Sequence, residues 1–257
     1  MNHMHFFPWD ERRDIANPGN REKTLAFSVE HFLNCAKEGM KMHGHFAVAL
    51  SGGSTPRAIF QALSKPPYAN GIDWTKVLLF WGDERHVPPT DPDSNFRMAI
   101  EAGFKNLPIP ATQIFRMQAE KNLETNALRY EAKIKEILGI RPFDLIMLGM
   151  GQDGHIASLF PQTTALKETK RWVVANYVPS KNTWRMTFTY PLINRGGNIV
   201  IYVLGEHKQK VVHNIFLGQQ IPPLPAALVG TRENKALWIL DKNAFGNLGQ
   251  AKTREED

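Results

Sequence analysis

The chain has 257 residues, of which 42% are hydrophobic and 22% charged, and its formal net charge is +6 at pH 7. This composition supplies enough apolar side chains for a sizeable core and excludes an intrinsically disordered chain, which would combine low hydrophobicity with high net charge. The lone cysteine, Cys35, excludes a disulfide-stapled fold and fits a reducing compartment, and we expect its side chain to be a small buried hydrophobe.

The distribution of apolar and basic residues bears on partners. No window approaches the roughly 18 continuous apolar residues of a membrane span, and the charges near the N-terminus follow a very short apolar patch, the reverse of a signal peptide. We therefore expect a cytoplasmic protein with no membrane partner. The basic residues are scattered, so we expect no nucleic-acid partner, because duplex binding requires a contiguous basic surface. A monomer and a small homo-oligomer both fit the sequence.

Apolar periodicity divides the chain into alternating helices and strands. In chain order it predicts a helix over residues 25–36, a strand over 46–50, a helix over 57–63, a strand over 77–81 and a helix over 95–102. It then predicts a helix over 123–137, a strand over 144–148, strands over 171–178 and 186–190, a strand over 199–204, a helix over 208–217 and a strand over 237–240.

The pattern of these elements indicates the fold class. Strands that are apolar almost throughout are typical of parallel strands covered on both faces: 46–50, 77–81, 144–148 and 199–204. Their alternation with helices predicts an α/β fold with a mostly parallel, doubly wound open sheet of the Rossmann-like kind. A small antiparallel excursion is expected over 171–190, where two predicted strands have no helix between them. No linker interrupts the chain, so we expect residues 1–257 to form a single domain.

Polar, glycine-containing segments follow each of the four buried strands. Ligands of open parallel sheets bind beyond the carboxyl ends of the strands. If the sheet is parallel, one rim therefore brings together residues 51–56, 82–86, 149–155 and 205–208. This convergence is the strongest functional indication in the sequence.

The first of these segments is a candidate phosphate cradle. It contains Ser51, Gly52, Gly53, Ser54 and Thr55. Its glycines free the backbone to turn, so that several N–H groups and the positive end of a helix point at one spot. We expect Thr55 to be the N-cap, followed by a proline in the first helical turn. Two alternatives remain open, a plain strand-to-helix turn and a nucleophile elbow centred on Ser51.

The third segment carries a candidate general base. Residues 149–154 match G-x-G-x-x-G, but no carboxylate follows the next predicted strand, so a dinucleotide site is not favoured. His155 comes directly afterwards, and a histidine with an ordinary pKa near 6.5 accepts a proton from water at neutral pH. Asp153 could orient it. The alternative is a histidine with a purely structural role.

The second segment places Asp83, Glu84 and Arg85 beside the expected rim. The alternative is a solvated charge cluster, and the same triplet at 10–12, for which we expect no function, shows how common it is. The pairs His3/His5 and His43/His45 lack further organised ligands, so we expect no metal site.

Taken in order, these segments and several others are similar to the 6-phosphogluconolactonase family, which shares its fold with the glucosamine-6-phosphate deaminases. The resemblance spans about residues 46–244 and rests on Ser-Gly-Gly-Ser-Thr-Pro (51–56), Trp-Gly-Asp-Glu-Arg-His-Val-Pro (81–88), Asp-Ser-Asn (93–95), Gly-Met-Gly-Gln-Asp-Gly-His-Ile-Ala-Ser-Leu-Phe-Pro (149–161), Arg-Met-Thr-Phe-Thr-Tyr-Pro (185–191), Lys208 and Pro-Ala-Ala-Leu-Val (225–229).

Two positions separate the lactonases from the deaminases. The deaminases that this chain resembles carry Tyr at the position of Arg85, and their ring-opening Glu falls on Phe160, which cannot move a proton. A lactonase has no such isomerisation to perform, and Arg85 suits an anionic product. Both differences favour the hydrolase.

The resemblance implies hydrolysis of 6-phospho-D-glucono-1,5-lactone in the oxidative pentose phosphate pathway, with no metal or organic cofactor. In this interpretation His155 is the general base, Arg85 stabilises the oxyanion or orients the lactone, and Asp83 and Asp153 position these groups. The phosphate is held by residues 51–55, Lys208 and Arg185. Arg57 and Lys181 are further candidates, although the segment around Lys181 departs from the family pattern.

Three alternatives stay open at this point. The first is a glucosamine-6-phosphate isomerase/deaminase. The second is a non-catalytic sugar-phosphate sensor, although no helix-turn-helix pattern is evident. The third is an esterase that uses Ser51 as its nucleophile.

Overall fold

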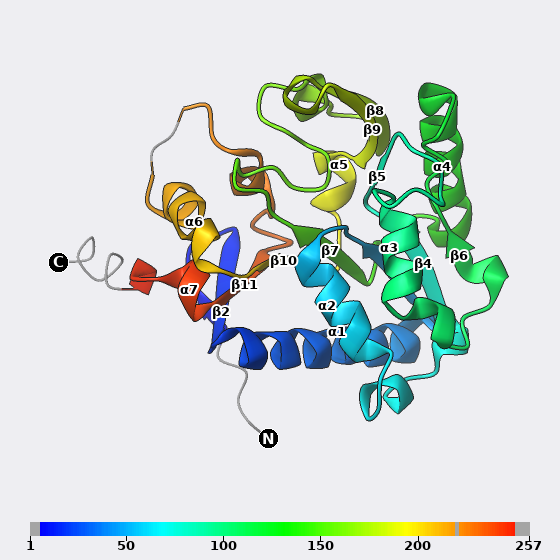
Figure 1. The fold of residues 1–257 in the computed structure, drawn as a ribbon, viewed down its shortest axis with the longest axis horizontal. Coiled ribbons are helices and arrows are strands. Elements are labelled where there is room, and N and C mark those ends of the chain that lie inside the picture. Colours follow the sequence, from blue (N-terminus) through cyan, green and yellow to red (C-terminus); the bar gives the residue numbers. More distant parts are fainter. Residues whose placement is uncertain (1–5, 219–220, 250–257) are drawn as a thin grey trace.

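The computed structural model describes residues 6–218 and 221–249. These residues form a large sheet with helices on both faces and a smaller sheet above one end (Figure 1). The larger sheet runs in the order β1-β2-β11-β10-β7-β3-β4-β6. Its strands are β1 (Phe6–Pro8), β2 (Arg13–Gly19), β3 (Phe46–Leu50), β4 (Val77–Trp81), β6 (Ile114–Phe115), β7 (Leu145–Gly149), β10 (Ile199–Val203) and β11 (Ala236–Asp241).

All strand pairs of the larger sheet are parallel except β1 with β2. The predicted α/β class with a mostly parallel sheet is therefore confirmed. The predicted strands over 46–50 and 77–81 have the expected bounds, and every residue in both is buried. Strands β1, β2 and β6 were not predicted, because they are short or carry few apolar residues; in β2 only Ile15 and Ala16 are buried.

The smaller sheet is the expected antiparallel excursion. It consists of β5 (Asp83–Arg85), β9 (Thr183–Phe188) and β8 (Val173–Val178), with both pairs antiparallel. Strand β9 begins three residues before the predicted 186–190, because its first half is polar and lacks an apolar pattern. Strand β5 was predicted as a loop.

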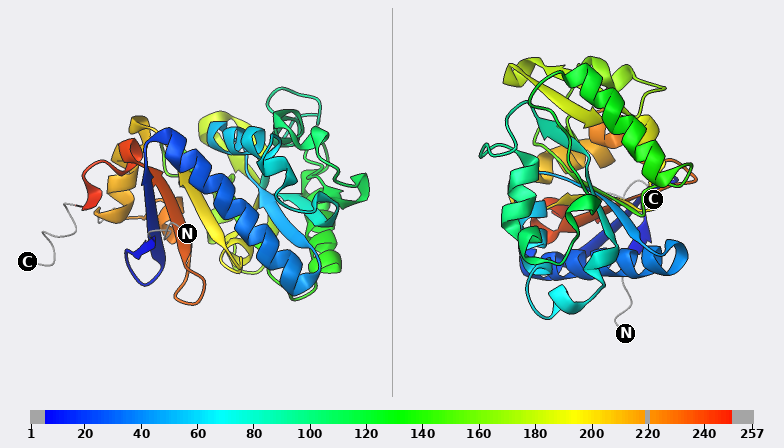
Figure 2. Two further views of the ribbon diagram at one scale, coloured as in Figure 1. Left: turned by 90° about the horizontal axis from the view of Figure 1, so that it is seen from below. Right: turned by 90° about the vertical axis from the view of Figure 1, so that its right-hand side faces the viewer.

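Helices cover both faces of the larger sheet. The α-helices of the described chain are α1 (Arg21–His43), α2 (Ser54–Leu63), α3 (Asn95–Ala102), α4 (Leu123–Leu138), α5 (Tyr190–Ile193), α6 (Gln209–Phe216) and α7 (Lys242–Phe245). Helix α1 lies across one face, against β2, β3, β7 and β11, and α2 packs beside it. Helix α4 and the smaller sheet pack together on the other side (Figure 2). Within residues 6–218 and 221–249, no helix is long and apolar enough to cross a lipid bilayer.

The ends of α1 follow from local chemistry. The side chain of Asn20 accepts a hydrogen bond from the backbone of Lys23 and caps the first turn. Gly44 ends the helix with a φ of 77°, a left-handed conformation that glycine adopts without a steric penalty. The N-terminal triplet at 10–12 also has a structural role, because Asp10 accepts hydrogen bonds from the backbone of Arg12 and the side chain of Arg13.

The side chains of His31 and Cys35 in α1 are buried and lie side by side. The Sγ atom of Cys35 is 3.7 Å from Nδ1 of His31. Burial, together with the charge of Asp144, raises the pKa of Cys35 to about 12, so the thiol stays protonated at neutral pH. The expectation of a buried cysteine is confirmed. Burial lowers the pKa of His31 from 6.5 to about 4.

The depressed pKa of His31 predicts an acid-sensitive core. The unfolded chain binds the His31 proton below its ordinary pKa of 6.5, whereas the folded chain resists it down to about 4. Stability contributed by this group is therefore complete above pH 6.5 and lost as the pH falls through that interval. Replacing His31 with Gln should flatten the decline in the free energy of unfolding between about pH 7.5 and about pH 5 by about 2 kcal/mol. Urea denaturation at the two pH values measures the difference, and parallel declines in the two proteins would contradict the prediction.

Candidate active site

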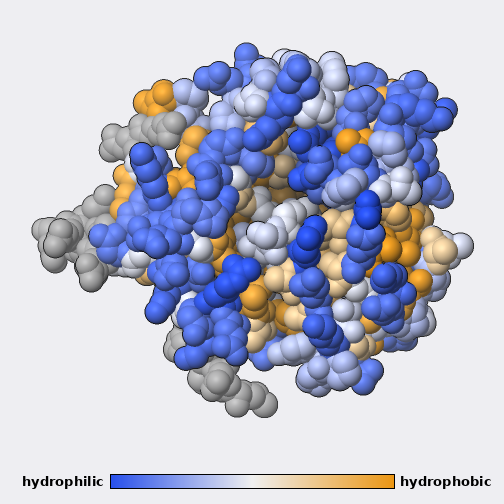
Figure 3. All heavy atoms as spheres, in the orientation of Figure 1, coloured by the Kyte–Doolittle hydropathy of each residue, from blue (hydrophilic) through white to orange (hydrophobic). Residues whose placement is uncertain are grey.

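A pocket of about 240 Å³ opens where β3, β4, β7 and β10 end. It lies on the face in Figure 3 that is hollowed near its centre, between the N-terminus of α2 and the smaller sheet. The four loops therefore meet at one rim of the sheet, as predicted. The lining residues are Ser51, Gly52, Gly53, Ser54, Thr55, Pro56, Asp83, Arg85, Gly149, Met150, Gly151, His155, Ala157, Tyr202, Val203, Leu204, His207 and Lys208.

The N-terminus of α2 forms one wall of the pocket. The N-cap is Gly53, with a φ of 102°, and not Thr55 as predicted, because the helix begins one residue before Thr55. No side chain caps this end, and the backbone N–H groups of Gly53, Ser54 and Thr55 have no acceptor among the described residues. Three free donors at the positive end of a helix dipole attract an anion. The wall is therefore suited to a phosphate group.

Close backbone packing holds this wall against the neighbouring loops. Ser51 Oγ accepts a hydrogen bond of 3.1 Å from the backbone N–H of Gly149 at the end of β7. A Cβ atom on Gly52 would lie 2.0 Å from Oδ1 of Asn95, so only glycine fits there. Asn95 begins α3 and in turn contacts Asp83. The phosphate wall, the end of β7 and the start of α3 are thus packed as one unit.

His155 faces the pocket from the loop after β7. Its Nδ1 atom is 2.5 Å from Oδ1 of Asp153, which also accepts a hydrogen bond from the backbone of His155. Its ring stacks on Phe160, with centroids 3.9 Å apart and planes inclined by 15°. A Cβ atom on Gly151 would lie 2.1 Å from Nδ1, so glycine is required beneath the imidazole edge. The ring is therefore held on three sides.

The charge state of Asp153 determines which imidazole nitrogen of His155 carries the hydrogen. Burial raises the pKa of Asp153, but the hydrogen bond and charge of His155 lower it by more, and the net result lies below the ordinary value. An ionised carboxylate can only accept, so Nδ1 carries the hydrogen and donates it. In the neutral ring Nε2 then has a free lone pair. This is the tautomer that a general base requires.

The backbone of this loop is strained where it meets the pocket. Ala157 lines the pocket with a φ of 47°, in the left-handed region that non-glycine residues seldom adopt. The next residue, Ser158, is buried and donates through its hydroxyl to Oδ2 of Asp83 at 2.7 Å. Its backbone is fixed by Thr187 and Asn176. The loop that carries His155 is thus tied to the strand that carries Asp83.

Strand alternation divides the roles of Asp83, Glu84 and Arg85. Asp83 and Arg85 face the pocket, whereas Glu84 points away from it. Glu84 accepts hydrogen bonds from the backbone of Arg85 and, at the N-terminus of α3, from the hydroxyl of Ser94 and the backbone of Asn95 and Phe96. Burial raises the pKa of Glu84 against the lowering effect of these backbone donors. Glu84 is a structural cap, and the predicted pair of carboxylates beside the site is reduced to Asp83.

Two arginines lie side by side on the smaller sheet. Arg85 and Arg185 are register partners in β5 and β9. Arg85 donates to the backbone oxygen of Asp93 at 2.6 Å, while the Nε atoms of both arginines are buried with no partner among the described residues. Burial and the charge of Arg85 lower the pKa of Arg185. Arg85 lines the pocket and Arg185 lies next to it, outside the lining.

Lys208 lines the pocket next to the loop that carries His155. Its Nζ atom donates to the backbone oxygen of Met150 at 2.8 Å, and burial lowers its pKa against the charge of Asp153. The neighbouring His207 also lines the pocket. This residue was not predicted, although it lies in the predicted rim segment 205–208. Its position shortly after a buried strand could have indicated that it lines the site.

Other predicted site residues lie outside the pocket lining. Asp153 does not line the pocket and acts on it through its contact with His155 and its charge near Lys208. Arg57 is exposed on the first turn of α2, and Lys181 is exposed in the turn between β8 and β9. Among residues 6–218 and 221–249, no group of three or more His, Cys, Asp or Glu side chains is arranged to hold a metal ion.

Comparison with known proteins identifies the family of this chain. Residues 19–238 match the model of the family described as glucosamine-6-phosphate isomerases/6-phosphogluconolactonase. The chain belongs to this family. A relative from Chlamydia trachomatis serovar D named 6-phosphogluconolactonase is 39% identical over 225 residues, which cover 88% of this chain and 86% of the relative. One of that name from Haemophilus influenzae is 37% identical over 201 residues, covering 77% and 85%.

Solved structures of the family share the fold of this chain. The devB protein superposes with a TM-score of 0.83 at 30% identity, over 92% of this chain and 99% of its own. The 6-phosphogluconolactonase of Thermotoga maritima gives a TM-score of 0.74 at 26% identity, over 90% and 99%. The expected resemblance and the Rossmann-like fold class are therefore confirmed.

The structural role of Glu84 predicts a large effect on stability. Glu84→Gln places an amide NH₂ among N–H donors and should lower the free energy of unfolding by about 1–3 kcal/mol. The matched control is Glu101→Gln at the other end of α3, whose exposed pair with Arg97 should contribute at most about 0.5 kcal/mol. Urea denaturation compares the two variants, and equal effects would show that Glu84 is not a cap.

Proposed function

We propose that the chain hydrolyses 6-phospho-D-glucono-1,5-lactone to 6-phospho-D-gluconate in the oxidative part of the pentose phosphate pathway. The observation that carries the proposal is an imidazole, oriented by a carboxylate, in a pocket that is also lined by free backbone donors and a lysine. Relatives that are up to 39% identical to this chain bear the name of this activity. The pocket thus combines a base with an anion site.

The phosphate of the substrate binds at the N-terminus of α2. The free N–H groups of Gly53, Ser54 and Thr55 donate to its oxygens, and Lys208 supplies a positive charge. Arg185 lies outside the pocket lining, so we assign it no contact with the phosphate. Because this end of the substrate does not react, its binding energy serves to position the lactone ring against His155.

His155 acts as the general base. Its Nε2 atom takes a proton from a water molecule, whose oxygen forms a bond to the lactone carbonyl carbon. The bond between that carbon and the ring oxygen then breaks, and the ring oxygen receives the proton from the imidazolium as it leaves. One water is consumed and the base is regenerated. Asp153 stabilises the transient imidazolium through the contact at Nδ1.

Arg85 stabilises the charge that develops on the carbonyl oxygen. Its guanidinium is fixed by the backbone of Asp93, so little reorganisation is needed when the oxyanion forms. Asp83 is held by Asn95 and Ser158 and balances the positive charge of Arg85 on the same face of β5. Both residues therefore position charge rather than transfer protons.

Two alternatives have less support. A deaminase needs a proton carrier at residue 160, where this chain has a phenylalanine stacked on the imidazole. An esterase with Ser51 as nucleophile needs a base within hydrogen-bond reach, whereas Ser51 donates to the backbone oxygen of Gly52 and accepts from Gly149.

The test is lactone hydrolysis, corrected for spontaneous opening, by the wild type and by His155→Ala. We expect turnover of the phosphorylated lactone and a kcat about 10²–10⁴-fold lower in the variant, the usual contribution of a general base. His213→Ala in α6, which lies outside the pocket lining, is the matched control and should keep wild-type kcat.

Other outcomes would overturn this proposal. Ammonia release from glucosamine 6-phosphate without lactone turnover would identify a deaminase. Binding of 6-phosphogluconate without turnover of either substrate would identify a sensor. Wild-type kcat in His155→Ala would remove the imidazole from its role.

Lys208 should act mainly on substrate affinity. Lys208→Ala removes a cation that contacts the non-reacting phosphate equally in the ground and transition states, so KM should rise by about ten- to a hundredfold while kcat changes little. The unphosphorylated lactone should be hydrolysed equally by both proteins. Lys210→Ala, an exposed neighbour in α6, is the matched control. A fall in kcat with an unchanged KM would contradict this assignment.

A further inference from the structure

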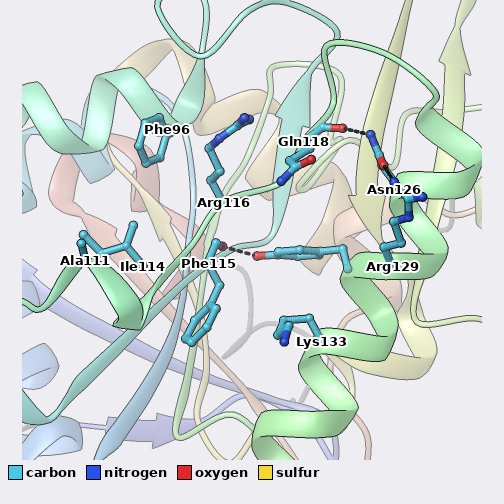
Figure 4. A pocket seen from close by; sticks show the side chains of 10 residues that line it. Phe96, Ala111, Ile114, Phe115, Arg116, Gln118, Asn126, Arg129 and Lys133 are labelled. Carbon is cyan, nitrogen blue, oxygen red and sulfur yellow. Dashed lines mark hydrogen bonds between the residues drawn. The ribbon is translucent and has the colours of Figure 1, made fainter.

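A second, larger pocket lies at the far edge of the sheet, between β6 and α4 (Figure 4). It encloses about 550 Å³, within the roughly 300–1,000 Å³ of small-molecule sites. Its lining shares no residue with the pocket around His155. The lining residues are Phe96, Ala111, Ile114, Phe115, Arg116, Gln118, Asn126, Arg129, Tyr130 and Lys133.

The lining combines aromatic rings with positive charge. Phe96 and Phe115 lie on one side of the cavity, and Arg129 and Lys133 project from α4 on the other (Figure 4). The lining residues include three cationic side chains and no carboxylate. Flat apolar surface opposite cationic side chains complements a ligand that has an aromatic body and an anionic group.

The cations of this pocket are unequally neutralised. Arg116 forms a two-pronged pair with Glu120, at 3.1 and 2.9 Å. Lys133 contacts Glu136 in a pair that is about half exposed and is therefore weak. Arg129 donates a long hydrogen bond, 3.4 Å, to Oδ1 of Asn126. The charge of Arg129 is thus the least compensated.

Arg129 and Lys133 also repel each other. They are four residues apart on α4 and so lie on one face of the helix, where like charges destabilise by about 0.2–0.5 kcal/mol. An anion bound between them would remove this repulsion and supply the acceptor that Arg129 lacks.

We propose that this pocket binds a planar aromatic ring system that carries a phosphate group, such as a nucleotide. The ring packs against Phe96 and Phe115, and the phosphate lies between Arg129 and Lys133. The ring and the anion contribute separately, so each half of such a ligand alone binds weakly.

The pocket is connected to the site around His155 by α3. The ring of Phe96 lines the pocket and contacts the ring of Trp81, with centroids 5.2 Å apart. The backbone N–H of Phe96 donates to Glu84 at 2.8 Å, and the adjacent Asn95 donates to Asp83. Tyr130, in the pocket wall, accepts a hydrogen bond from the backbone of Trp81. A ligand that displaces Phe96 therefore shifts the groups that hold Asp83.

The binding test uses the full chain with the first pocket saturated by 6-phosphogluconate. Titration calorimetry measures adenosine monophosphate and flavin mononucleotide, with adenosine and inorganic phosphate as half-ligands. We expect one of the two nucleotides to bind saturably, at least about tenfold more tightly than either half-ligand. The difference between the nucleotides identifies the preferred ring system.

Variants locate the bound probe. Arg129→Gln and Phe115→Ala should each weaken nucleotide binding by about tenfold or more. Arg21→Gln, an exposed arginine at the start of α1, is the matched control and should leave it unchanged. Unaltered binding in Arg129→Gln, or no binding of either nucleotide at about 1 mM with 6-phosphogluconate present, would overturn the proposal.

Connection to the first site is measured separately and rests on the proposed lactonase activity. The nucleotide that binds should change kcat or KM of the wild type but not of Arg129→Gln. If the chain has no lactone turnover, the calorimetric result still decides whether the second pocket binds its ligand, so failure of one proposal is distinguishable from failure of the other.

Discussion

The common direction of β3, β4, β7 and β10 is the constraint on which the active site depends. Parallel strands expose their carboxyl ends at one edge of the sheet. The direction of the strands is therefore enough to bring four loops from distant parts of the chain together there. Each loop brings one function: free backbone donors, a fixed guanidinium, an oriented imidazole and a lysine. Gly52 then allows its loop to approach Asn95 more closely than a side chain would permit, and Gly151 leaves room for the imidazole within its own loop.

Buried polar contacts convert this proximity into a defined geometry. Asp83 lies between Asn95 and Ser158, which join α3 and the loop of His155 to the smaller sheet. Glu84, one residue away on the opposite face of β5, anchors the same helix from the other side. Because buried polar groups without partners are unfavourable, such a connected set specifies one arrangement of the rim. The stacking of Phe160 on His155 then helps to hold the imidazole in the pocket lining.

The same contacts relate the two pockets. Helix α3 presents its first residues to the active site through Asn95 and to the second pocket through Phe96. The proposed sugar-phosphate site and the proposed nucleotide site therefore share a structural element although they share no lining residue. In such an arrangement, occupancy of one site alters the other through differential contacts with α3 or with Tyr130, which bonds the end of β4, and this gives the coupling a definite structural location.

Residue types and their spacing by themselves determined the class of the fold and the members of the rim. Continuous apolar runs at 46–50, 77–81, 144–148 and 199–204 revealed buried parallel strands. The polar segments that follow these four runs contain Ser51–Thr55, Arg85, His155 and Lys208. Local sequence could not show that Asp83 faces the pocket while Glu84 caps α3. It also could not place the start of α2 at Ser54 or show that His207 lines the pocket. Each of these features depends on neighbours that are distant in the chain. The second pocket was absent from the sequence analysis for the same reason: its aromatic and basic residues belong to three segments that become adjacent only when α4 packs beside the edge strand of the folded sheet.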